Sequence, residues 1–225
     1  GDIDDLVNMV DNVGPHIAGL KTHVDMIDGF SMEEWAKVID VAKKHDLMLF
    51  EDRKFADIGR VTETQMAGMY DIRSWADLVT SHSVSGPDIV DGIASAWDSV
   101  QRVGGVLLLA QMSSRGNLLD ASYTDRTMEI GTSSPHVIGY IGNGSNPNEV
   151  SELRGKAGDG KMIWTPGVNL SDNEGALGQR YGHPSDAIKA GSDAVIVGSG
   201  IHGAPDPVAS ARAYADATWA ALLSR

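Results

Sequence analysis

The sequence contains no cysteine, which excludes disulfide bonds, thiolate nucleophiles and zinc sites with sulfur ligands. No apolar run approaches the roughly 18 residues of a membrane-spanning helix, and no secretory leader pattern is visible. Basic residues are scarce, since 18 Lys and Arg stand against 31 Asp and Glu, for a net charge of -13. Nucleic acids and anionic membranes are therefore poor candidate partners, and we expect a cytoplasmic protein.

Short apolar runs alternate with longer amphipathic stretches along the whole chain, a pattern typical of alternating strands and helices. Seven runs predict strands, at residues 17–20, 47–50, 78–80, 106–110, 137–141, 162–164 and 194–197. The amphipathic stretches predict helices at residues 3–13, 31–45, 62–70, 87–96, 185–190 and 207–223. The turn-rich segment 142–160 predicts a surface excursion.

This alternation indicates an α/β fold of parallel strands, as an open doubly wound sheet or a closed eight-fold barrel. The 225 residues favour a single (β/α)8 TIM barrel over residues 1–225, because such barrels typically have about 250 residues. Seven strands do not close that barrel. Since the sequence opens on a predicted helix, we expect the first strand to precede residue 1.

Charged residues follow two of the predicted strands. Lys21 ends the first apolar run, while Asp52 and Lys54 follow the second and share one side of an extended chain. The carboxyl ends of barrel strands face the active-site mouth, so we expect these side chains, with Asp57, to form a candidate catalytic cluster of alternating sign. The spacing D-x-K-x-x-D alone is equally compatible with a surface ladder of ion pairs.

A longer string carries more information than this spacing. FEDRKFADIG at residues 50–59, with LKTHVD at residues 20–25, resembles the orotidine 5'-phosphate decarboxylase family, particularly its eukaryotic branch. Further matches follow in order over nearly the whole chain: SWADLV, LLLAQMSS, VIGYI, TPGV, ALGQRY and GSDAVIVG. The resemblance implies a (β/α)8 barrel, a homodimer with shared sites, and conversion of a 6-carboxyuridylate to the uridylate in pyrimidine biosynthesis, without cofactor or metal.

The resemblance also implies roles for the charged residues. Lys54 matches the lysine that protonates C6 of the pyrimidine, and Asp52 the carboxylate beside the substrate carboxylate. Lys21 matches the lysine that contacts the ribose, and Asp57 the aspartate that the second subunit contributes.

The implied substrate-binding residues lie further along the chain. Ser113 matches the serine at the pyrimidine amide, and Gln179 and Tyr181 match the phosphate-gripping lid. Pro166, in the TPGV match, is a further substrate-binding residue that the resemblance implies. Gly198 begins a Gly-Ser-Gly turn whose amides could form a nest for an anion.

Three positions depart from the family pattern near the phosphate and ribose. Ser199 stands where the family has the arginine that pairs with the phosphate, so a bidentate charged contact is lost. Arg60 and Val61 replace Asn-Thr, and valine cannot donate the threonine's hydrogen bond to the partner's ribose. The ribose-binding aspartate of the first strand has no match.

Alternatives to an orotidylate decarboxylase therefore remain. One is a decarboxylase of a related substrate with an altered or absent phosphate, and another is an inactive relative that acts as a binding protein. A third is the related group of sugar-phosphate decarboxylases and aldolases, against which the FEDRKFADIG string argues. We interpret His23, His82 and His202, near predicted strand ends, as hydrogen-bonding to a loop backbone or to a partner side chain, since no second ligand accompanies them at metal spacing.

Overall fold

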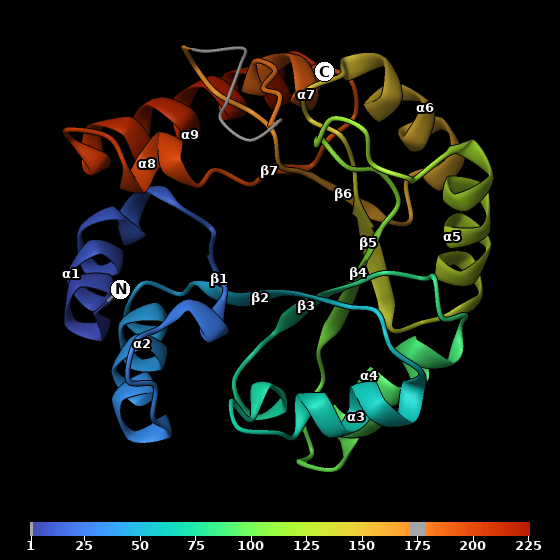
Figure 1. Ribbon diagram of the computed structural model, residues 1–225. Coiled ribbons are helices and arrows are strands. Elements are labelled where there is room, and N and C mark those ends of the chain that lie inside the picture. Colours follow the sequence, from blue (N-terminus) through green and yellow to red (C-terminus); the bar gives the residue numbers. More distant parts are fainter. Residues whose placement is uncertain (1, 172–178) are drawn as a thin grey trace. The chain divides into compact units, whose positions relative to one another are not determined.

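The computed structural model describes residues 2–171 and 179–225, in which helices and parallel strands alternate (Figure 1). The chain divides into two compact units, Gly1–Leu107 and Leu108–Arg225. The single domain predicted over residues 1–225 stays a prediction, as does a strand before residue 1.

The first unit contains three strands, β1 to β3, that pair in parallel in chain order. Figure 1 shows its helices along one side of these strands. Its elements are α1 (Ile3–Val13), η1 (Gly14–His16), β1 (Gly19–Thr22), η2 (Val24–Met26), α2 (Met32–Lys44), β2 (Met48–Phe55), α3 (Gly59–Met66), η3 (Ile72–Ser74), β3 (Leu78–Ser81) and α4 (Asp88–Asp98).

Helix α2 shows how local chemistry sets these boundaries. The hydroxyl of Ser31 accepts the Glu34 backbone N–H at 3.2 Å and so caps the helix. Acidic residues lie in its first turn and Lys43 and Lys44 in its last, which suits the helix dipole. Its inner face buries Trp35, Val38, Val41 and Ala42.

Strand β4 (Gly105–Leu109) lies across the boundary between the units and is buried along its whole length. Val106, Leu107, Leu108 and Leu109 are at most 1% exposed. A continuous apolar run of this kind is typical of a parallel strand that is covered on both faces.

The second unit contains the parallel strands β5 to β7, again paired in chain order. Figure 1 shows α5, α6, α7 and α9 along their outer side. Its elements are α5 (Ala121–Ser133), β5 (Val137–Ile141), α6 (Pro147–Ala157), β6 (Met162–Thr165), α7 (Pro184–Lys189), β7 (Ala194–Val195), α8 (Ser199–His202) and α9 (Pro207–Leu223).

All seven predicted strands are confirmed, but the surface excursion predicted over residues 142–160 is wrong, because it contains α6. Asn146 caps this helix and Pro147 begins it, while only Val150 and Leu153 reach the core, both 0% exposed. Two apolar residues are too few for a clear helical periodicity. Helix α5 was missed for a similar reason, since half of its buried positions hold threonine.

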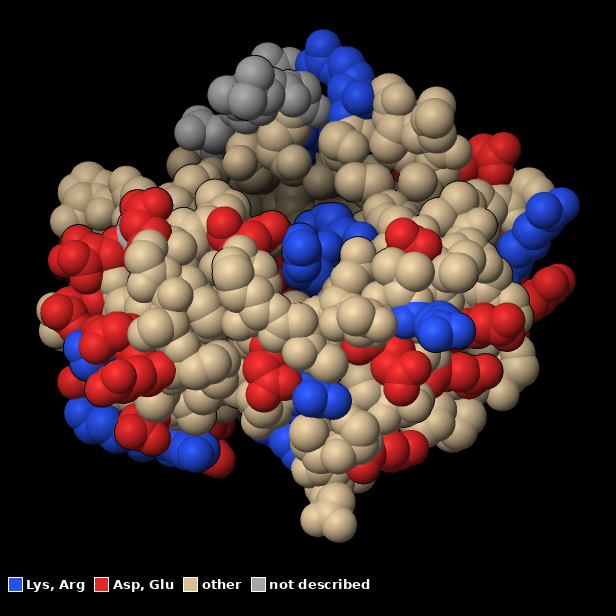
Figure 2. All heavy atoms as spheres, turned by 60° about the horizontal axis from the view of Figure 1, so that its bottom comes forward, with Lys and Arg blue, Asp and Glu red and all other residues tan. Residues whose placement is uncertain are grey.

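Acidic and basic side chains are interspersed on the face of the molecule seen in Figure 2. Within residues 2–171 and 179–225, no helix combines the length and apolar character needed to cross a bilayer.

Candidate active site

The candidate site begins with an irregularity in β2. Glu51 pairs with Val79 and Phe55 with Ser81, so four steps along β2 match two steps along β3. The two extra residues form a bulge, within which Lys54 has a φ of 51°. Bulges of this kind redirect side chains and are common beside active sites.

Lys21, Asp52 and Lys54, which we call the charge cluster, converge as predicted. The Oδ2 atom of Asp52 lies 2.7 Å from Lys54 Nζ and 3.3 Å from Lys21 Nζ. Lys21 comes from β1 and the other two from β2, so the carboxyl ends of neighbouring parallel strands bring them together. The prediction assumed that side chains alternate regularly along an extended strand. The bulge interrupts this alternation, and Asp52 contacts Lys54 within the irregular segment.

Burial and neighbouring charges act in opposite directions on this cluster. Burial alone would raise the pKa of Asp52, but the Lys21 and Lys54 ammonium groups outweigh it and hold the pKa below its ordinary value. Burial lowers the pKa of Lys21, and Asp52 opposes that effect. The neighbouring charges therefore favour the ionised form of Asp52, whereas desolvation works against the charge of Lys21.

His23 extends the cluster through its imidazole. Its Nε2 atom lies 2.8 Å from Lys21 Nζ and 3.6 Å from Asp52 Oδ2. An ammonium group can only donate, so the imidazole nitrogen accepts. Burial and the charge of Lys21 lower the pKa of His23, which favours this neutral form.

No contact described in the structure joins Asp57 to the charge cluster. Asp57 is exposed, and its carboxylate accepts the backbone N–H of Ile58 at 2.7 Å. Its carbonyl accepts the Ser85 hydroxyl at 2.9 Å. Its contribution to a partner's site stays a prediction.

A second group of predicted residues meets in the second unit. The Gln179 side-chain amide donates to the Ser113 hydroxyl at 2.9 Å. Gly167, which follows Pro166, has a φ of 78°, and a Cβ there would lie 2.6 Å from the Ser113 Cβ. Only glycine fits this position, so the TPGV block packs directly against Ser113.

The other predicted binding residues are Tyr181, Gly198 and Ser199, which make no described contact with Ser113 or Gln179. Tyr181 is half-buried and lies close enough to Tyr214 to affect it electrostatically. Ser199 is exposed and begins the short helix α8, and the Gly198 carbonyl accepts the Ile201 N–H at 2.9 Å. The nest predicted around Gly198 stays a prediction, and residues 176–178 of the ALGQRY match lie outside the described residues.

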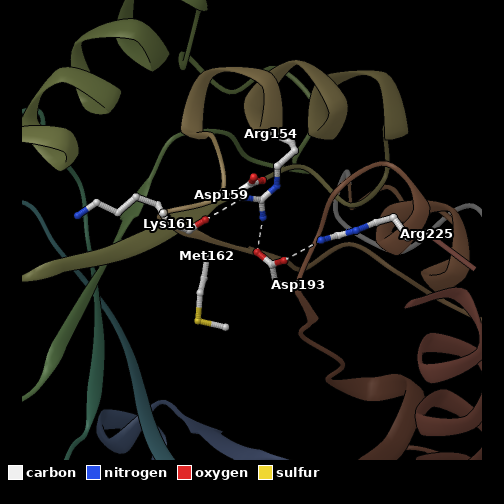
Figure 3. Close-up of a pocket in the computed structure, with 7 residues that line it drawn as sticks. Arg154, Asp159, Lys161, Met162, Asp193 and Arg225 are labelled. Atoms are coloured by element: carbon white, nitrogen blue, oxygen red, sulfur yellow. Dashed lines mark hydrogen bonds and ion pairs between the residues drawn. The ribbon is translucent and has the colours of Figure 1, made fainter. Parts of the chain in front are cut away.

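A hollow of about 450 Å³ lies at the amino ends of β6 and β7. Figure 3 shows Asp193 there between the guanidinium groups of Arg154 and Arg225. Arg154 also donates to the carbonyls of Gly191 and Lys161. The two guanidinium groups thus bind groups of the protein itself, at the amino ends of the strands, where barrel residues contribute to stability.

Sequence reasoning missed Thr80 and Glu51. Thr80 lies at the carboxyl end of β3, and the rule that singled out Lys21 and Asp52 could have found it. Glu51 is 0% exposed, and its carboxyl accepts the Thr22 hydroxyl at 2.6 Å and the Val24 N–H at 3.2 Å. Its burial was not predictable, since it depends on packing against η2.

The buried Glu51 makes stability depend on pH. Burial raises its pKa from 4.5 to about 7, against the hydrogen bonds from Thr22 and Val24. The folded protein then holds the proton more tightly than the unfolded chain, so the contribution of Glu51 to stability is highest at low pH, falls as the pH rises from 4.5 to about 7, and levels off above that. We expect urea unfolding from pH 5 to 8 to show wild type losing about 2.5 kcal/mol relative to Glu51→Gln.

The exposed Glu129 supplies the matched control for this measurement. Glu129→Gln removes one carboxylate without touching a buried site, so its stability should follow wild type across the range. Parallel pH curves for wild type and Glu51→Gln would contradict the assignment of the titration to Glu51.

Parallel strands alternating with helices, with charged side chains at the carboxyl ends of the strands, are the arrangement of (β/α)8-barrel enzymes. The model of the orotidine 5'-phosphate decarboxylase / HUMPS family matches residues 1–214, and the chain belongs to this family. The resemblance inferred from FEDRKFADIG is therefore confirmed.

Individual relatives agree with this placement. The orotidine 5'-phosphate decarboxylase of Maudiozyma exigua is 42% identical over 230 residues, covering 98% of this chain and 82% of the relative. The orotidine 5'-phosphate decarboxylase of Kodamaea ohmeri is 38% identical over 227 residues, covering 98% of this chain and 84% of the relative. The crystal structure of the Pyrococcus horikoshii OT3 enzyme matches with a TM-score of 0.75 at 25% identity, over 96% of this chain and 94% of that one.

The fold is supported by a second solved structure. The Methanocaldococcus jannaschii orotidine 5'-monophosphate decarboxylase, complexed with the inhibitor BMP, matches with a TM-score of 0.75 at 22% identity. The match covers 96% of this chain and 94% of the solved chain. The predicted (β/α)8-barrel class is thereby confirmed.

Proposed function

We propose that this protein decarboxylates orotidine 5'-monophosphate to UMP. The observation that carries the proposal is the convergence of the Lys21 and Lys54 ammonium groups on one oxygen of Asp52, in a chain that belongs to this family. The test is a paired assay of CO₂ release from orotidylate and from unphosphorylated orotidine. Turnover of orotidylate supports the proposal, while release from neither substrate favours the binding-protein alternative.

The chemistry follows from the charges present. When the C6–carboxylate bond breaks, CO₂ departs and the electron pair stays on C6, in a ring orbital that no carbonyl delocalises. A fixed ammonium group nearby stabilises this charge and can donate its proton to C6. Lys54 is the donor in this proposal, and its amine regains a proton from solvent.

Asp52 holds the two lysines together in the proposed reaction. Its low pKa keeps it ionised at neutral pH, so it stabilises both ammonium groups before the substrate binds. Lys21 and Lys54 are then already oriented when charge develops on the ring, which reduces the reorganisation needed in the transition state.

The family resemblance implies further contacts with the substrate, and these are part of the proposal. Ser113 and Gln179 lie within hydrogen-bonding distance of each other and offer a hydroxyl and an amide for the pyrimidine and the phosphate. Pro166 and Tyr181 join this group in the proposal. Energy from these contacts is available to orient the reacting ring.

We also propose a homodimer in which Asp57 completes the partner's site. Two apolar side chains near Asp57 in the fold are exposed, Ile58 by 59% and Val84 by 68%. The hydrogen bond from Ser85 to the Asp57 carbonyl brings the loop of Val84 to the same place. Apolar groups that remain exposed beside a functional carboxylate are typical of an interface. The cytoplasmic location stays a prediction.

Ser199 permits a direct test of the phosphate. Ser199→Arg should lower the KM for orotidylate about ten- to hundred-fold, because a charge-assisted contact contributes roughly 1.5 to 3 kcal/mol. Steady-state kinetics on orotidylate and orotidine measure the change. Ser199→Gln adds length without charge and is the control, and an unchanged KM in Ser199→Arg would favour a substrate with an altered or absent phosphate.

A further inference from the structure

Thr80, on the neighbouring strand β3, hydrogen-bonds to the Asp52 side chain and to the Lys54 backbone. It is 1% exposed on β3, and its Oγ1 atom lies 2.8 Å from Asp52 Oδ1 and 2.8 Å from the backbone nitrogen of Lys54. A backbone N–H can only donate, so the Lys54 amide donates to the hydroxyl oxygen. The hydroxyl hydrogen is then directed to the ionised carboxylate of Asp52.

The first consequence concerns the orientation of Asp52. Thr80 occupies Oδ1, and the contacts with Lys54 and Lys21 are both made by Oδ2. The carboxylate is thus fixed at both oxygens, and its plane cannot turn without breaking the bond to Thr80. Hydrogen bonds to an ionised carboxylate are among the stronger ones in proteins.

The second consequence concerns the backbone of Lys54. Its φ of 51° lies in the left-handed region, which residues with long side chains rarely adopt. Such a conformation persists only where surrounding contacts require it. The bond from the Lys54 amide to Thr80 supplies such a contact within the bulge, where the regular pairing with β3 is interrupted.

We propose that Thr80 is a positioning residue for the decarboxylation, a role that rests on the proposed function. Its one hydroxyl sets the plane of Asp52 and the backbone turn of Lys54 together. It thereby fixes the position of the Lys54 ammonium group relative to the substrate carbon. Thr80 itself does not touch the reacting atoms in this proposal.

Thr80→Val tests this role, because valine keeps the shape of threonine and removes the hydroxyl. We expect kcat on orotidylate to fall about thirty- to hundred-fold with KM changed less than about threefold, since the lost contact acts on the reacting groups. Thr80→Ser restores a hydroxyl and should keep kcat within about fivefold of wild type. Thr80→Ala takes the place of Thr80→Val if that variant does not fold.

Thr127 provides the control for loss of a buried hydroxyl. It is 0% exposed on α5 and donates to the Tyr123 carbonyl at 2.9 Å. Thr127→Val should leave kcat at the wild-type value. Equal kcat in wild type and Thr80→Val, or loss of kcat in Thr80→Ser equal to that in Thr80→Val, would overturn the proposal.

A structural measurement separates this inference from the proposed function. Crystal structures of wild type and Thr80→Val should show the Asp52 carboxylate turned and its contact with Lys54 Nζ lengthened beyond 4 Å in the variant. An inactive wild-type protein would remove the proposed function, and the two structures would still test the positioning. An unchanged charge cluster in Thr80→Val would overturn the positioning role even in an active enzyme.

Discussion

Lys54→Ala is expected to reduce CO₂ release from orotidylate at least about 10⁴-fold, because in the proposed reaction it removes both the proton donor and a cation beside the developing charge. The side chain is 37% exposed, so its removal should leave the fold intact. Measurement of kcat by CO₂ release, with circular dichroism for the fold, checks this result.

Lys37 is the matched control for Lys54. It also forms an ion pair, with Glu34, and its side chain is 47% exposed. Lys37→Ala should therefore reproduce the general effect of losing a lysine and its partner while kcat stays at the wild-type value. Undiminished turnover in folded Lys54→Ala would remove the central assignment of this site.

Mixing Lys54→Ala with Asp57→Ala subunits is expected to restore activity that neither variant has alone. If each site takes Lys54 from one subunit and Asp57 from the other, a hybrid dimer has one complete site and one with both defects. Random exchange of subunits makes half of the dimers hybrid, so activity should reach about a quarter of wild type.

The mixture needs a comparison in which complementation is impossible. Lys54→Ala mixed with Asp52→Ala provides it, because both residues belong to the same cluster and no hybrid site is complete. Activity should stay at the level of the separate variants there. If the Lys54→Ala and Asp57→Ala mixture also stays inactive after proven subunit exchange, Asp57 acts within its own subunit.

Most of the fold was predictable because its signals are local. The apolar runs at residues 137–141 and 162–164 become β5 and β6, and the amphipathic stretch 31–45 contains α2. Helix α6 was not predictable by the same means. It begins at an Asn cap and buries only two apolar side chains, too few for a helical periodicity.

The candidate site divides in the same way. The convergence of Lys21 with Asp52 follows from the parallel pairing of β1 and β2, which the alternation of strands and helices implies. The contact of Thr80 with Lys54 depends on a bulge that the register of β2 against β3 creates. No periodicity in either segment indicates this bulge.

The amino-acid order alone determined which reactive side chains stand at the carboxyl ends of the strands, because apolar periodicity and helix caps act over a few neighbouring residues. Only the tertiary structure decided the left-handed turn at Lys54, the bridging hydroxyl of Thr80 and the buried carboxyl of Glu51. Each of these results from contacts between segments more than 20 residues apart, as the span from Asp52 to Thr80 shows. Such contacts exist only once the chain has packed.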